Sequence, residues 1–310
     1  MEFRNCIKNL TIVDDTLEKL GIITDCKLYR RTIWLILGWF TLAIFIICME
    51  IIYYPLRRQD EDIVPTIYVP FMRIYCIHIT VISDLIITSI LGYIGLKFDQ
   101  INKHLEKLTN DNKCRKNLAL KHSVLSFHQS KYAKAKSSAC IIWIIMHLHL
   151  ELRKISRKID LMFGTQMTIE MGNYFAFIAI AIQELFNVTF IKNNNNKILV
   201  YIYLIIILLW LFLHVFRLSL INYGCESVSI KANATRNFIS KLSYSNCDIE
   251  IRENILQFLL MTQSPFRFYG LGLFQFGFKF LQGVHYKCIY IYIYIYIYIY
   301  IYIYIYILYI

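Results

Sequence analysis

Ionisable side chains lie inside long apolar segments of this chain. Asp84 falls near the middle of the apolar stretch 66–96, and Arg73 and His78 precede it in the same stretch. Charged residues inside a membrane-spanning segment are costly, so they usually face protein and mark functional positions. We therefore predict that Asp84 faces the interior of a helical bundle, either paired or protonated.

No group of residues predicts catalysis or metal binding. The chain lacks an HExxH helix, a phosphate-binding P-loop, a GxSxG turn and a GxGxxG loop. Gly270 and Gly272 are interpreted instead as glycines that pack between helices. His147 and His149 are two positions apart on an expected helix, so their rings diverge and a structural role is expected. We predict a protein that is not an enzyme and holds no cofactor or metal.

The nine cysteines are scattered along the chain without a CxxC pair. An odd number of cysteines, in and beside apolar segments, argues against both a disulfide framework and a zinc site.

The composition is typical of a protein with several membrane spans. Apolar residues make up 57% of the 310 residues and charged residues only 17%, against about 25% in soluble domains. A membrane helix needs about 20 mostly apolar residues, and four segments meet this: 32–54, 66–96, 165–189 and 198–220. The apolar stretch 140–150 is too short, and we expect a buried or interfacial helix there. The predicted fold class is all-α, a polytopic bundle of transmembrane helices.

The charges between the spans predict which side of the membrane each connection faces. Residues 97–160 carry 14 Lys and Arg against 5 Asp and Glu, which accounts for most of the net charge of +12. Because basic connections stay in the cytosol, we place 1–31, 97–160 and 223–284 there, with a cytosolic N-terminus. This explanation of the charge needs no nucleic-acid partner. Segment 1–31 also lacks the apolar core of a signal peptide.

The connection 97–160 is helical in pattern where it meets the two neighbouring spans. Apolar residues recur at three- and four-residue spacing, first at Phe98, Ile101 and Leu105 and again at Leu148, Leu152, Ile155, Ile159 and Phe163. Such spacing is typical of amphipathic helices. We therefore expect the second and third spans to continue into the cytosol as helices and to pack there.

The last residues, 289–310, alternate between Ile and Tyr, with 11 Ile, 10 Tyr and 1 Leu. Strict alternation gives a helix no distinct face and gives a strand an aggregation-prone pattern. The codons ATA and TAT, for Ile and Tyr, also alternate in an AT dinucleotide repeat. We interpret 285–310 as a low-complexity tail translated from repeat DNA.

Four short motifs occur in an order that resembles the insect gustatory receptor family, over about residues 5–284. The first is VDDTLEKLG at 13–21, and the second, FDQINKHL at 98–105, is similar to the family's F-x-x-L-N-x-x-L element. The third is HLEL at 149–152 followed by Phe163 and Gly164, and the fourth is similar to the family's F-x-x-x-G-L-F element. The matching motif positions are Phe98, Asn102, Leu105, His149, Leu152, Phe268, Gly272, Leu273 and Phe274.

Two departures from the family pattern lead us to expect an incomplete chain. The first motif precedes the third helix of the family, so the four spans would correspond to helices three to six. After Gly283, the sequence HYKC at 285–288 and the Ile-Tyr tail replace the family's T-Y…Q-F element. The pore helix would then be missing, and we predict that this chain does not conduct ions on its own.

The resemblance implies a receptor domain at 32–284 in the plasma membrane, forming one subunit of a homo- or hetero-tetrameric ligand-gated cation channel. Its partners would be lipid, other receptor subunits and a small-molecule tastant bound between the outer halves of the helices. Polar residues there are candidate ligand contacts: Glu50, Tyr54, Tyr75, His78, Gln183 and Tyr203. Each also has a structural interpretation, such as an interfacial tyrosine or a hydrogen bond between helices.

Three other interpretations stay open. A G-protein-coupled receptor would need an extracellular N-terminus, against the charge distribution. A transporter would show repeated halves or helices broken by Gly and Pro, whereas Pro is nearly absent from these spans. A non-functional fragment of the same family is the third.

Overall fold

The computed structural model describes residues 2–22, 27–57, 63–119, 128–188, 197–245 and 249–283. Within these residues the chain is almost entirely helical, and its strands are a single pair of two residues each. The predicted all-α fold class is therefore confirmed. The Ile-Tyr tail lies outside the described residues.

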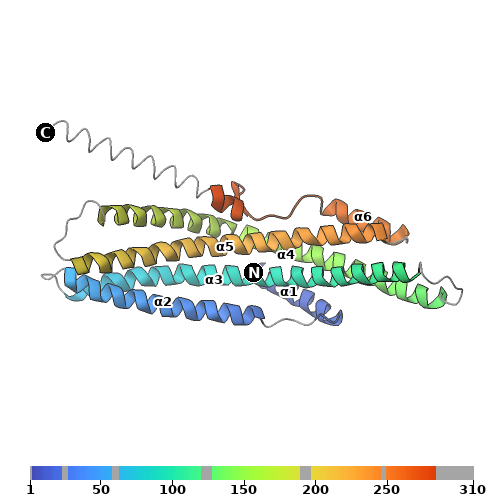
Figure 1. Cartoon of the computed structure of the whole chain (residues 1–310), viewed down its shortest axis with the longest axis horizontal. Coiled ribbons are helices and arrows are strands. Elements are labelled where there is room, and N and C mark those ends of the chain that lie inside the picture. Colours follow the sequence, from blue (N-terminus) through green and yellow to red (C-terminus); the bar gives the residue numbers. More distant parts are fainter. Residues whose placement is uncertain are drawn as a thin grey trace, which may run out of the picture.

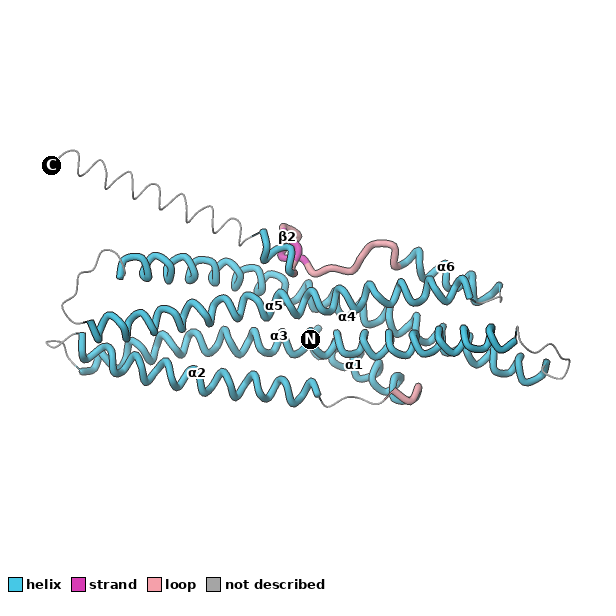
Figure 2. The backbone as a smooth tube through the Cα atoms, in the orientation of Figure 1, coloured by secondary structure: helices cyan, strands magenta, loops and turns pink. Residues whose placement is uncertain are grey.

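The helices form an elongated bundle (Figure 1). Helices α3, α4 and α5 run along its length, with α2 beside α3 and α5 at one end and α1 and α6 towards the other (Figures 1 and 2). In chain order the elements are α1 (Glu2–Lys19), α2 (Lys27–Arg57), α3 (Ile63–Ala119), α4 (His128–Phe186), α5 (Lys197–Ser245), α6 (Ile249–Met261), β1 (Tyr269–Gly270) and β2 (Phe274–Gln275).

The three long helices extend far beyond the thickness of a membrane. Helix α3 has 57 residues and α4 has 59, so each is about 85 Å long at 1.5 Å per residue, against about 30 Å of hydrocarbon. The predicted continuation of the second and third spans as helices is confirmed. Residues 140–150 are buried in part, as expected, but they are the interior of α4 and not a separate short helix.

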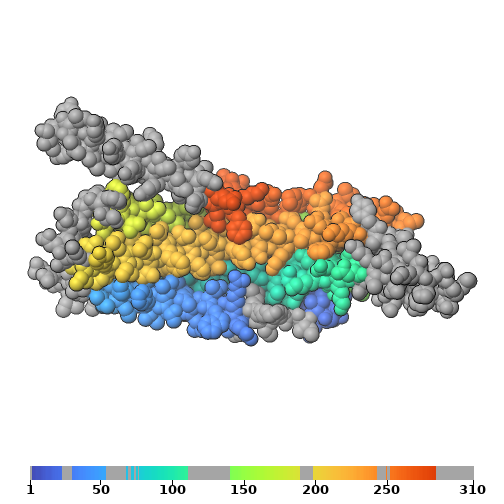
Figure 3. Space-filling model, viewed as in Figure 1, coloured from blue at the N-terminus to red at the C-terminus, as the bar shows by residue number. Residues whose placement is uncertain are grey.

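In the part of the chain that the structure describes, four helices contain segments long and apolar enough to cross a membrane: Arg30–Tyr53, Ile77–Asn110, Cys140–Phe186 and Ile198–Leu242. They overlap the four spans expected from the sequence. Large apolar side chains on α2, among them Trp34, Phe40 and Ile44, are exposed on the surface of the bundle. An apolar outer surface on long helices is what contact with lipid requires. Figure 3 shows α2 and α5 side by side along one face of the molecule.

Apolar side chains form two cores at different levels of the bundle. The smaller core joins α2, α3 and α5 through Trp39, Ala43, Ile46, Val81 and Leu213. The larger core joins α1, α3, α4, α5, α6 and the hairpin.

Helix α1 is fixed to the larger core by polar contacts as well as by apolar ones. Asp14 forms an ion pair with the buried Lys97 of α3, with 2.8 Å between Asp14 Oδ1 and Lys97 Nζ. The Tyr93 hydroxyl donates a hydrogen bond to the same carboxylate.

The segment 262–277 follows α6 and is not helical; we name it the connecting segment. It contains a β-hairpin in which Tyr269 pairs with Gln275 and Gly270 with Phe274. Leu271 and Gly272 form the turn with φ of 51° and 72°, a left-handed conformation that favours glycine. The interpretation of Gly270 and Gly272 as helix-packing glycines was therefore wrong.

Side chains from α4 and α5 bind the backbone of the connecting segment. Arg153 donates to the carbonyl of Ser264 at 2.5 Å, and the Asp160 carboxylate accepts from the Tyr269 amide at 3.2 Å. Asn233 bonds both backbone groups of Phe266, and Asn222 accepts from the Gly277 amide at 2.9 Å. These bonds satisfy backbone groups that a helix would satisfy internally.

Candidate functional site

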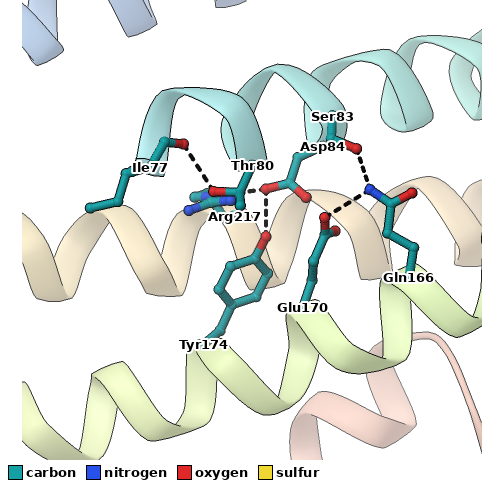
Figure 4. Close-up of polar contacts among 8 residues, drawn as sticks. All are labelled: Ile77, Thr80, Ser83, Asp84, Gln166, Glu170, Tyr174 and Arg217. Atoms are coloured by element: carbon teal, nitrogen blue, oxygen red, sulfur yellow. Dashed lines mark hydrogen bonds and ion pairs between the residues drawn. The ribbon is translucent and has the colours of Figure 1, made fainter. Parts of the chain in front are cut away.

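Polar side chains from three helices meet inside the bundle at the level of Asp84 (Figure 4). We name this group the buried polar cluster; its members are Ser83 and Asp84 of α3, Gln166, Glu170 and Tyr174 of α4, and Arg217 of α5.

Asp84 is the centre of the cluster and is only 1% exposed. Its Oδ2 atom lies 2.7 Å from Nε of Arg217, and the Tyr174 hydroxyl donates to the same oxygen at 2.6 Å. The guanidinium of Arg217 also lies 4.6 Å from the centre of the Tyr174 ring, within the range of a cation–π contact. Asp84 therefore faces the bundle interior and is paired, with one partner from α4 and one from α5.

Glu170 is also buried and belongs to the same cluster. The Gln166 amide donates to Glu170 Oε1 at 3.0 Å and to the Ser83 hydroxyl, which joins α4 to α3. The Glu170 carboxyl group faces that of Asp84 (Figure 4). Within the residues that the structure describes, no three His, Cys, Asp or Glu side chains are grouped closely enough to bind a metal ion.

One face of α5 carries a line of aromatic and polar residues that leads away from Arg217. This α5 stripe consists of Tyr203, Trp210, His214 and Arg217. Their spacing of seven, four and three residues places them on the same side of a helix. His214 stacks on Phe177 at 4.8 Å between ring centres and lies 5.9 Å from Trp210, so the rings fill the space between α4 and α5.

The far end of the α5 stripe contacts α2 and α4. Trp210 donates its indole N–H to Glu50 Oε1 at 3.0 Å. Tyr203 stacks on Tyr53 with ring centres 5.1 Å apart, and its hydroxyl donates to Glu184 Oε2 at 3.1 Å. Two of the residues predicted as ligand contacts, Glu50 and Tyr203, are thus part of one continuous group.

The other predicted contacts lie elsewhere. His78 accepts a hydrogen bond from Trp39 Nε1 at 2.9 Å, so it joins α3 to α2 away from the stripe. Tyr75 and Gln183 are exposed on the bundle surface. The side chain of Tyr54 lies outside the described part of the chain. The structure therefore brings together only part of the predicted set, and ligand contact by His78, Tyr54, Tyr75 and Gln183 stays a prediction.

The bundle with its polar interior can be compared with known families. The profile of the 7tm chemosensory receptor family matches residues 2–285, which is most of the chain. The chain belongs to this chemosensory receptor family. The match is consistent with the resemblance to insect gustatory receptors drawn from the motifs. No curated protein matches the chain. Together with the four candidate spans, the family identifies a multi-pass membrane receptor.

The motif residues of this chemosensory receptor lie in its larger core, away from the α5 stripe. Phe98, Leu105 and Leu152 are fully buried. The His149 ring contacts Phe98 of α3 and Phe258 of α6, with both pairs of ring centres 5.3 Å apart. These motif positions therefore hold α3, α4 and α6 together.

Asn102 joins α3 to α5 in the same core. Its amide donates to the Lys231 carbonyl at 2.8 Å, and its side-chain oxygen accepts from the Thr235 hydroxyl at 2.7 Å. A buried amide that satisfies both its donor and its acceptor fixes the register of two helices.

The last motif of the receptor forms the hairpin. Phe268 is fully buried, Gly272 supplies the turn, and Leu273 is 79% exposed. Phe274 stacks on Phe280 at 4.5 Å, which joins the hairpin to the helical residues 278–283.

Sequence reasoning missed the partners of Asp84. Arg217 directly follows the uncharged run 198–216, and Glu170 lies inside the third expected span, 165–189. The spacing of Tyr203, Trp210, His214 and Arg217 was the available signal, because polar residues on one helix face in an apolar segment indicate an inward face.

Proposed function

We propose that this chemosensory receptor is a subunit of a tetrameric ligand-gated cation channel in the plasma membrane, and that its ligands are small-molecule tastants. Family membership supports a receptor role. The channel, the tetramer and the tastant follow from the resemblance to insect gustatory receptors.

The ligand would bind at the far end of the α5 stripe. Supporting this are Tyr53, Tyr203 and Glu184, which bring two aromatic rings and a carboxylate together where α2, α4 and α5 meet. Ligand sites are mostly apolar and aromatic, with a few polar groups that fix orientation. A ligand that accepts a hydrogen bond from the Tyr203 hydroxyl in place of Glu184 would change the packing of α5 on α4, and this change would gate the channel.

The proposed topology places the N-terminus and the larger core in the cytosol. Its support is the basic charge of 97–160, including exposed residues such as Lys103 and Lys154. The α2 end of the bundle, with the far end of the α5 stripe, would then face the outside and be reachable by a tastant.

Because the chain is predicted not to conduct on its own, the experiment uses a receptor in which the family's last helix replaces residues 285–310. It compares Tyr203→Phe with Tyr201→Phe in cells that express this receptor. Tyr201 is a matched control because it lies on the same helix and is 65% exposed. Currents are recorded against a panel of sugars, bitter compounds and amino acids, with surface amounts measured in parallel. We expect Tyr203→Phe to change the half-maximal concentration by roughly two- to tenfold, as for one hydrogen bond, and Tyr201→Phe to have no effect.

The possible results distinguish an error in the channel proposal from an error in the proposed ligand site. If the panel evokes no current although the protein reaches the surface, the channel proposal is wrong. Currents that respond alike to both variants would refute the site and leave the channel proposal standing. For topology, Lys103→Cys should not react with a membrane-impermeant thiol reagent added outside intact cells. Labelling there would favour the G-protein-coupled alternative.

A further inference from the structure

The buried polar cluster holds two carboxyl groups and one permanent cation. Asp84 is ion-paired with Arg217, whereas Glu170 has no ion pair among the described residues. With both carboxyl groups ionised, the cluster would carry a net charge of −1. An uncompensated charge is costly in an apolar interior, so the cluster needs one more positive charge.

The hydrogen bonds show where that charge is missing. Asp84 Oδ2 accepts from Arg217 and Tyr174, and Glu170 Oε1 accepts from Gln166. The other two oxygens, Asp84 Oδ1 and Glu170 Oε2, are buried and have no donor within the described part of the chain. Two acceptors without a donor therefore lie on two carboxyl groups that face each other (Figure 4).

We propose that Asp84 and Glu170 together bind one proton, which Glu170 Oε2 carries and donates to Asp84 Oδ1. Two carboxylates that face each other at close range do not both ionise, and a shared proton turns their repulsion into a hydrogen bond. With this proton, both oxygens are satisfied and the cluster has no net charge. The site joins α3 to α4, so the proton stays bound only while these helices are packed together.

The groups around the pair leave the proton as the fitting occupant. From α4, Tyr174 and Gln166 already donate, and from α3, Ser83 accepts from Gln166. From α5, Arg217 pairs with Asp84, and the ring of His214 lies against Tyr174 and Phe177. A metal cation bound by oxygen needs about six ligands, whereas the pair offers two free oxygens.

Infrared spectroscopy of the purified, reconstituted receptor tests the proposal directly. A protonated carboxyl group has a C=O stretching band that a carboxylate lacks, and the band shifts in D₂O. The test variant is Glu170→Gln, whose amide supplies a permanent donor towards Asp84. The matched control is Glu184→Gln on the same helix, where Glu184 accepts from Tyr203. We expect the wild type and Glu184→Gln to show the band at neutral pH, and Glu170→Gln to lose it.

A second measurement follows the melting temperature of the solubilised receptor from mildly acidic to mildly alkaline buffer. Because the folded bundle holds a proton that an unfolded, solvated carboxylate releases, the wild type should become less stable as pH rises. Glu170→Gln should remove this pH-dependent decrease, and Glu184→Gln should keep it.

Several results would overturn the proposal. One is a wild type without the band; another is a band that persists in Glu170→Gln. A melting temperature that follows sodium concentration and not pH would identify a metal cation as the occupant. Failure of Glu170→Gln to accumulate, while Glu184→Gln accumulates, would also refute it, because the amide already carries the donor that the pair needs. None of these tests depends on ligand or on channel activity.

Discussion

Replacing Arg217 by methionine should destabilise this receptor strongly, because it leaves the carboxylate of Asp84 buried without its cation. In the variant, Asp84 keeps the Tyr174 hydroxyl as its donor on Oδ2 and loses the guanidinium that lay 2.7 Å away. Removing one partner of a buried ion pair costs about 3–5 kcal/mol. We therefore expect a cost of this size for Arg217→Met.

The double variant Asp84→Leu/Arg217→Met should be more stable than Arg217→Met alone. Removing the carboxylate abolishes the unpaired charge, and what remains is the Tyr174 hydroxyl and the Glu170 carboxyl group without their acceptor. A neutral donor without an acceptor costs less than an unpaired buried charge. Replacing a whole buried ion pair by apolar residues is often close to neutral. The expected signature is strong non-additivity within the double-mutant cycle.

The assay heats detergent-solubilised receptor and then measures the fraction that stays folded by size-exclusion chromatography with fluorescence detection. A loss of about 3 kcal/mol corresponds to a decrease in Tm of roughly 5 °C for a chain of this size. Lys103→Met is the matched control, because Lys103 pairs with Asp99 at a similar 2.8 Å but is 73% exposed. An exposed pair within a helix contributes only about 0.3–0.5 kcal/mol.

Two results would refute this reasoning. If Arg217→Met lowers Tm no more than Lys103→Met does, the burial of the pair has no energetic consequence. If the double variant loses the sum of the two single losses, Asp84 and Arg217 do not stabilise each other.

Two further predictions concern the parts of the receptor outside the cluster. Gly277→Ala should lower the free energy of unfolding by about 1–3 kcal/mol, because Gly277 has φ of +140°, a backbone conformation that residues with a Cβ atom rarely adopt. Gly172→Ala should leave Tm unchanged, because a Cβ atom there meets nothing within 4 Å. Equal shifts in the two variants would contradict the argument. Asp14→Asn should release α1 from α3, because Lys97 would stay buried without its carboxylate. Limited proteolysis would then cut near residue 20 faster than in Asp15→Asn, whose carboxylate is exposed; unchanged cleavage would mean that apolar contacts alone hold α1.

The sequence predicts those features of the fold that depend on local pattern. Runs of apolar residues locate the spans, because the free-energy cost of placing a side chain in water or in lipid depends on its type. The spacing of Phe98, Ile101 and Leu105 predicts the extension of α3. The burial of Asp84 follows from the cost of a charge in an apolar segment. Its partner does not follow, because Arg217 lies 133 residues further along the chain and only tertiary packing brings them together.

The hairpin shows a different limit. Its turn has one leucine and one glycine in the left-handed conformation. Asp160, Asn222 and Asn233 on distant helices accept hydrogen bonds from the backbone of the connecting segment that contains it. Local propensity at Gly270-Leu271-Gly272 is compatible with a turn but does not require one. Side chains elsewhere decide the outcome, so Gly270 and Gly272 were wrongly interpreted as glycines that pack between helices.

The length of α3 has a mechanical consequence. From Asp84 to Ala119 the helix runs without interruption, a distance of about 50 Å. If it moves as a stiff rod pivoting near the cluster, a tilt of about 5° there displaces the far end by about 4 Å, by simple leverage on the helix rise. Ligand binding that tilts α3 only slightly at the α5 stripe would thus move the far end of α3 by more than the diameter of an atom, at the end of the receptor where α6 packs.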